Sequence, residues 1–156
     1  MPKQSAGLIM YRVVNGELEL LLVHPGGPFW ARKDLGAWSI PKGEYLPEED
    51  PLQVARREFR EETGLTPEGE FRELAEIRQA GGKRVKAWLF AGDWDPAGLI
   101  SNGFTMEWPP RSGRQAEFPE VDRAAWFTVA EAREKILASQ LPLIDQVTAL
   151  ALPHDR

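Results

Sequence analysis

The sequence contains no cysteine, and this absence excludes two kinds of site. No disulfide can form, and no thiolate is available to bind a metal ion. Imidazole is almost as scarce, because His24 and His154 are the only histidines among the 156 residues. Zinc sites rely largely on these two residue types. The sequence therefore argues against a zinc protein.

Long apolar stretches and an excess of positive charge are also missing. The N-terminal region lacks the apolar run of a signal peptide or a membrane span, so we expect a cytoplasmic protein with no membrane partner. Lys and Arg number 19 against 24 Asp and Glu, a net charge of −5, which disfavours broad nucleic-acid binding. The length and the 42% hydrophobic content predict one domain over residues 1–156.

The most informative stretch is residues 43–65. Its second half predicts a helix on which Glu58, Glu61 and Glu62 share one face, because they are spaced i, i+3 and i+4. The stripe beside this face can pack on a sheet and consists of Leu52, Ala55, Phe59 and Thr63. A divalent cation such as Mg²⁺ would offset the repulsion between the carboxylates. Taken alone, the three glutamates are more typical of a solvated acidic surface.

The full pattern favours the metal site over the solvated surface. It consists of Gly43, Glu49, Arg57, Glu58, Glu61, Glu62 and Gly64, with apolar residues at Phe59 and Leu65. At roughly 6% usage per residue type, a chance match in so short a chain is on the order of 10⁻⁷. The pattern resembles the Nudix box without a gap or a substitution. The chain is thus similar to Nudix hydrolases over this stretch, and the landmarks on both sides of it are similar as well.

This resemblance implies a fold, a reaction and a set of ligands. The fold is a mixed α/β (α+β) structure, an α/β/α sandwich with a mixed central sheet. The reaction is Mg²⁺-dependent hydrolysis of a nucleoside diphosphate linked to another group, with Mn²⁺ as a substitute metal. The implied metal ligands are the backbone carbonyl of Lys42 and the carboxylates of Glu58, Glu61, Glu62 and Glu120.

The resemblance also suggests catalytic roles. Glu120 matches a second landmark, a glutamate six residues before the tryptophan of a strand, here Trp126. Glu117 is the second choice for this role, and the alternative is that Glu120 is a capping or surface glutamate. Either Glu61 or Glu120 is expected to be the general base. Arg57 is expected to orient the carboxylates of the box, with Glu49 as a supporting partner.

Two further segments carry candidate substrate contacts. Residues 29–36 are predicted to form a loop in which Trp30 stacks on a base beside cationic side chains, or else covers the edge of the core. Residues 95–119 are predicted to form a long ordered loop, with a short strand near Phe104. Arg111 and Arg114 in this loop suit phosphate oxygens, or they form structural ion pairs. Lys42 is the remaining candidate for a substrate contact.

The substrate class is left broad. Within the family, a tyrosine after the box often marks enzymes for dinucleoside polyphosphates, and a proline often marks enzymes for ADP-ribose. Residues 79–83 contain neither, so the sequence does not assign the chain to either class. A nucleoside triphosphate or a dinucleoside polyphosphate is expected. The alternatives are a non-catalytic module that binds a nucleotide, and a pyrophosphatase for a diphosphoinositol polyphosphate or a nucleotide sugar. Homodimers are common in the family, so a homodimer is compatible with the resemblance.

Sequence patterns also predict the main elements. Strands are expected at residues 6–14, 17–24, 37–40, 70–79 and 83–94, with a hairpin turn at Asn15-Gly16. Helices are expected after Asp50 as N-cap, up to Gly64, and over residues 129–139 and 141–150. Thr128 and Glu131 are predicted to form a capping box at the second helix. The apolar face of the last helix would comprise Leu143, Ile144, Val147 and Leu150.

Overall fold

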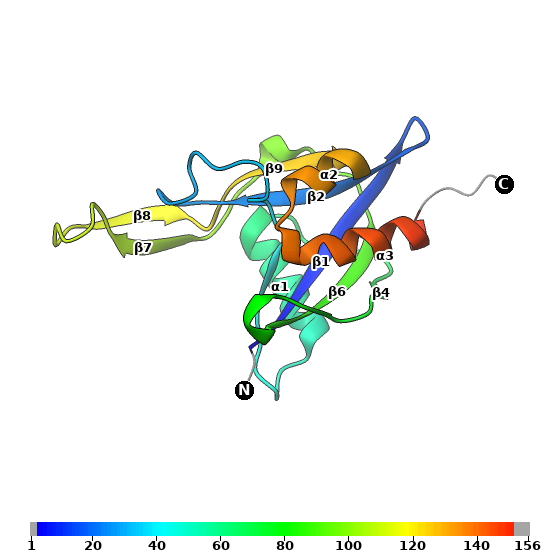
Figure 1. The fold of residues 1–156 in the computed structure, drawn as a ribbon, viewed down its shortest axis with the longest axis horizontal. Helices are drawn as coiled ribbons and strands as arrows, with labels where there is room; N and C mark the ends of the chain where they lie inside the picture. The colour runs from blue at the N-terminus through cyan, green and yellow to red at the C-terminus, as the bar shows by residue number, and fades with distance from the viewer. Residues whose placement is uncertain (1–2, 152–156) are drawn as a thin grey trace.

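The computed structural model describes residues 3–151, which form a mixed sheet with helices on both faces (Figure 1). The strands are β1 (Gln4–Val14), β2 (Glu17–Pro25), β3 (Lys42–Glu44), β4 (Arg72–Glu73), β5 (Ile77–Arg78), β6 (Arg84–Ala91), β7 (Gly103–Glu107), β8 (Gln115–Pro119) and β9 (Val121–Thr128). The helices are α1 (Pro51–Thr63), α2 (Val129–Lys135) and α3 (Leu141–Ala151). None of the helices within residues 3–151 has the length and apolar character needed to cross a bilayer.

The central sheet combines parallel and antiparallel pairs. Its strands follow the order β4-β6-β1-β2-β9, with β3 paired to β1 and β5 paired to β6. β1 and β6 run parallel, whereas β1 with β2 and β2 with β9 run antiparallel. Asn15 and Gly16 join β1 to β2 at φ angles of 52° and 81°, the left-handed geometry that a two-residue hairpin needs. The predicted mixed sheet and the first hairpin are therefore confirmed.

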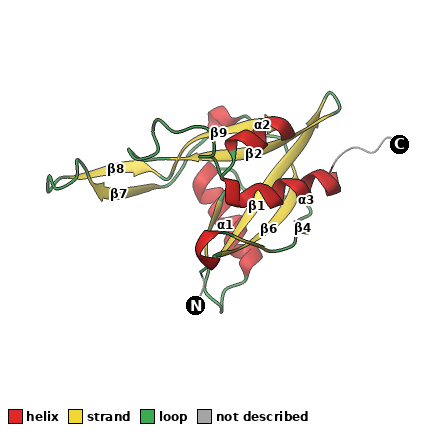
Figure 2. Ribbon diagram, in the orientation of Figure 1, coloured by secondary structure: helices red, strands yellow, loops and turns green. Residues whose placement is uncertain are grey.

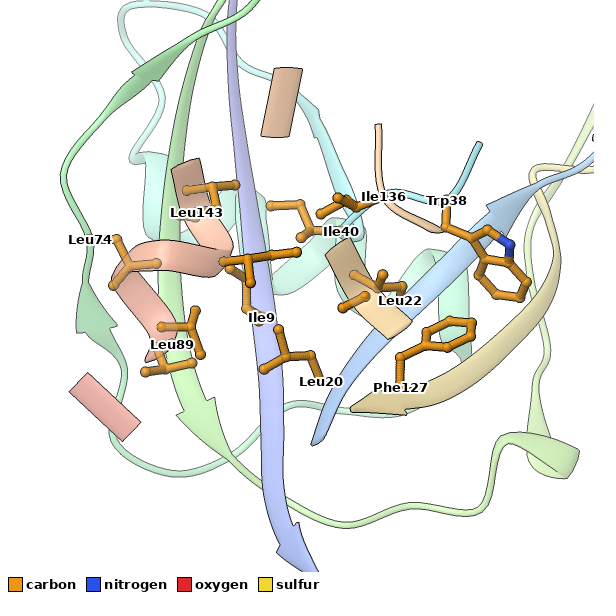
Figure 3. Close-up of a cluster of buried hydrophobic side chains, with 14 of the residues drawn as sticks. Ile9, Leu20, Leu22, Trp38, Ile40, Leu74, Leu89, Phe127, Ile136 and Leu143 are labelled. Carbon is orange, nitrogen blue, oxygen red and sulfur yellow. The ribbon is translucent and has the colours of Figure 1, made fainter. Parts of the chain in front are cut away.

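The two faces of β1 pack against different helices, because side chains alternate along a strand. Leu8 and Met10 pack on one face with Phe59 of α1. Ile9 packs on the other face with Leu143 of α3, in the cluster drawn in Figure 3. Figure 2 shows α1 behind the sheet, with α2 and α3 in front of it. The sandwich implied by the resemblance is confirmed.

Residues 70–79 do not form the single strand that we predicted. The two short strands β4 and β5 flank a break at Ala75, where Gln146 of α3 replaces a neighbouring strand. The Ala75 amide donates to Gln146 Oε1 at 2.7 Å, and Gln146 Nε2 donates to the Ala75 carbonyl at 3.0 Å. A partner 71 residues away thus interrupts the strand.

The prediction of a helix over residues 129–139 was too long. α2 ends at Lys135, because Ile136 adopts an extended conformation and forms a parallel bridge with Trp38. The amide of Leu137 then donates to the Trp38 carbonyl at 2.8 Å. These contacts hold the segment after α2 against the strand-like segment that leads into β3.

The last two helices confirm the predicted capping box of α2 and narrow the predicted apolar face of α3. The capping box of Thr128 and Glu131 is confirmed, since each side chain accepts a hydrogen bond from the backbone amide of the other residue. In α3, Leu150 is 39% exposed, so it does not belong to the buried face. That face consists of Leu143, Ile144 and Val147.

Residues 103–119 form a hairpin where we predicted a loop. β7 and β8 pair antiparallel, with Phe104 opposite Phe118 and Met106 opposite Ala116, so the short strand expected near Phe104 is present with an additional partner. The two strands form a sheet separate from the central one, and the hairpin projects away from the body of the protein at the left of Figure 1. We call residues 103–119 the arm.

Candidate functional site

Helix α1 carries Glu58, Glu61 and Glu62, three of the four glutamates of the box. Pro51 occupies its first turn, and Gly64 ends it in a left-handed conformation (φ 85°), with its amide donating to the Arg60 carbonyl at 2.8 Å. Asp50 lies at the predicted N-cap, but its side chain makes no capping hydrogen bond. Because Val54, Ala55 and Phe59 are buried against the sheet, the acidic side of the helix faces the site.

Gly43 brings the backbone of β3 against α1. A Cβ placed at Gly43 would lie 2.1 Å from the carboxyl carbon of Glu58. Lys42 and Gly43 are held in the sheet by antiparallel pairing with Gly7 and Ala6 of β1. The carboxylate of Glu58 therefore lies directly on the backbone next to Lys42, whose carbonyl is one of the predicted ligands.

Glu62 is the most buried of the box glutamates, with 8% of its surface exposed. The pKa of Glu62 is raised to about 9, chiefly by burial and in addition by repulsion from Glu58 and Glu120. The nearby ammonium of Lys42 acts in the opposite direction, and burial lowers the pKa of Lys42 itself. Carboxyl groups are thus concentrated where little water can reach, and the buried one favours its protonated form.

Glu120 joins the group from the end of the arm. Its amide donates to the Asn102 carbonyl at 2.8 Å, and the Asn102 amide donates to the Glu61 carbonyl at 2.8 Å. The Glu120 carbonyl accepts from the Gly26 amide at 2.9 Å. Partial desolvation raises the pKa of Glu120, with repulsion from Glu58 and Glu61 as further causes. The structure therefore brings Glu120 and the box together.

Arg57 lies among the acidic side chains. Its guanidinium lies 3.4 Å from Glu58, 3.7 Å from Glu61 and 3.8 Å from Glu49. Glu49 in turn accepts a hydrogen bond from the Leu46 amide at 2.8 Å. Arg57 therefore contacts three of the acidic side chains of the box, and Glu49 is one of them.

The donor set suits a hard divalent cation. Within residues 3–151, no three Asp, Glu or His side chains are already gathered closely enough to hold a metal ion. The groups that face one another are nevertheless all oxygen donors, and the mutual repulsion of Glu58, Glu62 and Glu120 is the feature that a bound cation would relieve. The carboxylate of Glu61 lies beside Arg57, as does that of Glu58.

The aromatic and arginine side chains that we predicted to contact substrate lie outside the group of carboxylates. Trp30 packs partly on the core, with the Lys33 ammonium 5.0 Å from the centre of its ring, while Phe29 is 60% exposed. Arg111 and Arg114 lie at the tip of the arm, which points away from α1 (Figure 1). The structure does not bring these two arginines to the carboxylates of their own chain.

Sequence reasoning missed three residues that hold the site in place. Asn102 links Glu61 to Glu120 through backbone groups, for which a side-chain pattern gives no signal. Gly26 permits the chain crossing, because a Cβ there would lie 1.9 Å from the Pro119 carbonyl oxygen. The buried His24 has Nδ1 at 2.8 Å from Asp122 and Nε2 at 2.6 Å from the Lys33 carbonyl, which ties the 25–36 loop to β9. Of these three residues, only Gly26 could have been noticed in the sequence, because the Gly26-Gly27 pair is typical of a close backbone approach.

Two known enzymes are similar to parts of this chain. The bis(5'-nucleosyl)-tetraphosphatase (asymmetrical) of Mus musculus is 34% identical over 101 residues, which cover 57% of this chain and 65% of the mouse protein. The RNA pyrophosphohydrolase of Xanthomonas campestris is 42% identical over 50 residues, or 31% of this chain and 24% of the relative. Both alignments therefore span less than two thirds of the relative's own length.

Wider comparisons cover nearly the whole chain. A crystal structure of an Ap4A hydrolase binary complex from C. elegans superposes with a TM-score of 0.64 at 26% identity, covering 94% of this chain and 96% of the other. The model of the NUDIX domain matches residues 1–147. With the box helix, the sandwich and the acidic site all in place, the chain belongs to the Nudix family.

Proposed function

We propose that this protein is a divalent-metal-dependent pyrophosphohydrolase acting on a nucleoside triphosphate or a dinucleoside polyphosphate. One observation carries the proposal. The carboxylates of Glu58 and Glu62 on α1 and of Glu120 beside β9 lie close together, and repulsion among them contributes to the raised pKa of Glu62 and of Glu120. Bringing these carboxylates together costs free energy unless they bind a cation. A bound cation promotes the hydrolysis of phosphoanhydrides.

The proposed ligands are these three carboxylates, that of Glu61 and the Lys42 carbonyl. Mg²⁺, with Mn²⁺ as the alternative, would neutralise phosphate charge and lower the pKa of an attacking water. Gly43 contributes by leaving room for the Glu58 carboxylate beside the backbone. Arg57 contributes by holding the carboxylates of the box in one orientation through its fork of donors.

Glu61 and Glu120 remain the two candidates for the general base. Glu120 is exposed and its pKa is raised, so it can accept a proton from water at a pH nearer to neutral than an ordinary glutamate. Glu61 is half-buried, and its carboxylate lies 3.7 Å from the Arg57 guanidinium. A raised proton affinity in an accessible side chain favours Glu120 as the base.

The substrate assignment rests on the relatives. The mouse relative is named as a bis(5'-nucleosyl)-tetraphosphatase and the Xanthomonas relative as an RNA pyrophosphohydrolase. Trp30, Lys42, Arg111 and Arg114 stay as predicted substrate contacts. A cytoplasmic location and a homodimer are proposed with the same function. The other candidates are a non-catalytic nucleotide-binding module and an enzyme for a diphosphoinositol polyphosphate or a nucleotide sugar.

A substrate panel tests the proposal. Nucleoside triphosphates, dinucleoside polyphosphates, nucleotide sugars and a diphosphoinositol polyphosphate are incubated with Mg²⁺, with Mn²⁺ or with EDTA, and the products are identified by mass. We expect cleavage of a phosphoanhydride bond that requires the metal. Glu61→Gln and Glu120→Gln should lose turnover while they still bind nucleotide. If no substrate in the panel is cleaved under any of these conditions, the chain is not the enzyme proposed here.

A further inference from the structure

The arm has few partners in its own chain. β7 and β8 pair with each other and lie apart from the central sheet, and Figure 1 shows the hairpin extending beyond the rest of the protein. A two-stranded hairpin is marginally stable in water unless something covers it. A further contact, beyond those within the arm, is therefore needed to stabilise the hairpin.

One face of the arm is apolar and only partly covered. Phe104, Met106, Ala116 and Phe118 alternate with exposed polar residues and are half-buried. The cover comes from the 25–36 loop, where Gly27 lies under Phe104 and Phe29 packs edge-to-face on Trp108 with 5.4 Å between ring centres. Phe29 remains 60% exposed although it packs on Trp108.

The tip of the arm is ordered and positively charged. The Trp108 amide donates to the Arg114 carbonyl at 2.9 Å, and the Gly113 amide donates to the Glu107 carboxylate at 2.7 Å. These bonds hold Arg111 in a left-handed conformation (φ 62°) at the end of the turn. Among residues 3–151, neither Arg111 nor Arg114 forms an ion pair. Two guanidinium groups are thus presented to solvent on a fixed turn.

The arm starts at the acidic site but ends far from it. Its two roots are Asn102, which is bonded to the Glu61 carbonyl, and Glu120 itself. Five residues of a strand rise about 3.4 Å each, so the tip lies roughly 17 Å beyond these roots. An arginine side chain cannot span that distance back to the carboxylates.

We propose that the arm of one chain docks on a second copy of the chain and brings Arg111 and Arg114 to the phosphate-binding side of the second copy's carboxylate site. Charge complementarity supports this partner. The chain carries a net charge of −5, its tip is basic, and the acidic group of Glu58, Glu62 and Glu120 lies where a polyphosphate is expected. Guanidinium forks pair bidentately with phosphate oxygens.

Exchange between two copies also fits the geometry of closed dimers. In a two-fold dimer each copy gives and receives the same contact, so two arms cover two sites and no arm is left free. The apolar face of each arm would be buried against the partner, which supplies the cover that the hairpin lacks. The role of the arginines at the reaction rests on the proposed function, whereas the docking of the arm does not.

Mixed dimers test the arrangement directly. A chain with Arg111→Ala/Arg114→Ala keeps intact carboxylates, and a chain with Glu61→Gln keeps an intact arm. The two are co-expressed with different tags and purified over both. If arms act on the partner, the mixed dimer has one complete site and recovers about half of the wild-type kcat, although both parents are impaired. Activity no higher than that of the parents would overturn the proposal, as would a failure to recover a mixed dimer.

A second pairing is the control. Wild-type chain is combined with a chain that carries Glu61→Gln, Arg111→Ala and Arg114→Ala together. Arms that act on the partner leave this dimer without a complete site, so it should be nearly inactive. About half of the wild-type activity would instead show that each arm serves its own chain. Thr105→Ala on the exposed face of the arm should change neither result.

A crosslink separates the docking from the catalysis. Because the chain has no cysteine, Arg111→Cys in one tagged chain and Glu61→Cys in another supply the only thiols. Oxidation should give a product of twice 17.6 kDa that carries both tags. This result stands even if no substrate is cleaved, in which case only the proposed function fails. Light scattering that shows a monomer, with no doubly tagged product, would rule out the exchange of arms.

Discussion

Gly43 and Glu58 are in such close contact that the glycine has no room for a side chain. Its α-carbon faces the carboxyl group of Glu58, and a Cβ would lie 2.5 Å from both carboxylate oxygens. This contact fixes the distance between the backbone of β3 and the acidic side of α1. The glycine of the box therefore has a steric role that can be tested by substitution.

Gly43→Ala should displace the Glu58 carboxylate and lower kcat/KM by about 100-fold, because a displacement of about 1 Å in a catalytic group has a cost of this size. Circular dichroism should show an unchanged fold. Gly98→Ala is the matched control, since a Cβ there meets the Trp94 Nε1 at an ordinary 3.6 Å. Full activity of Gly43→Ala would show that Glu58 does not need its present position.

The raised pKa of Glu62 predicts how the stability of the metal-free protein changes with pH. Its pKa is raised from 4.5 to about 9, so the folded state binds the proton more tightly than the unfolded chain. The resulting stabilisation is complete below pH 4.5 and is lost as the pH rises towards 9. In EDTA, the melting temperature should fall between pH 5 and pH 9, and Glu62→Gln should reduce this fall.

The same variant tests the link to the metal. At pH 8, Mg²⁺ should raise the melting temperature of the wild-type protein, because a bound cation replaces the proton, and should raise that of Glu62→Gln much less. Glu68→Gln is a suitable control, because Glu68 is exposed outside the box. Equal responses to Mg²⁺ in Glu62→Gln and the wild-type protein would exclude Glu62 as a ligand.

Arg57→Gln should lower kcat strongly and change the free energy of unfolding only slightly. The guanidinium is 42% exposed, so its ion pairs with Glu49, Glu58 and Glu61 contribute about 1 kcal/mol or less to the free energy of unfolding. Loss of carboxylate orientation should nevertheless reduce kcat by roughly tenfold or more. Arg60→Gln, three residues along the same helix and exposed, should keep its activity. A shifted pH–rate profile in Arg57→Gln would indicate a positioning role, and an unchanged kcat would refute it.

Thr128→Ala should destabilise the protein by about 1 kcal/mol, because it removes the acceptor for the Glu131 amide at the start of α2. Urea unfolding measures this change in the free energy of unfolding. Thr105→Ala, at an exposed position of the arm, serves as the comparison. A loss no larger than that of Thr105→Ala would show that the cap is not needed in the folded protein.

The features that could be predicted from sequence are the local ones. The spacing of Glu58, Glu61 and Glu62, the Asn15-Gly16 turn and the end of α1 at Gly64 each depend on residues within a few positions of one another. Local propensity determines these elements before any long-range contact forms.

The features that were missed depend on distant partners. The break at Ala75 comes from Gln146 in α3, and α2 stops where Ile136 reaches Trp38. The strands of the arm are five residues long and separated by a proline-rich turn, so their alternation was too short to be distinguished from a loop. The link from Glu61 to Glu120 consists of backbone hydrogen bonds through Asn102, which leave no trace in the residue types.

The cross-strand register of the arm limits how its length can change during evolution. Phe104 pairs with Phe118, Met106 pairs with Ala116, and Glu120 follows immediately after the second strand. Inserting one residue into either strand would turn the apolar side chains to the opposite face. Lengthening both strands by two residues would keep every side chain on its face and leave Glu120 where it is. Homologous arms that also keep the turn on the same face should therefore differ in length by multiples of four residues.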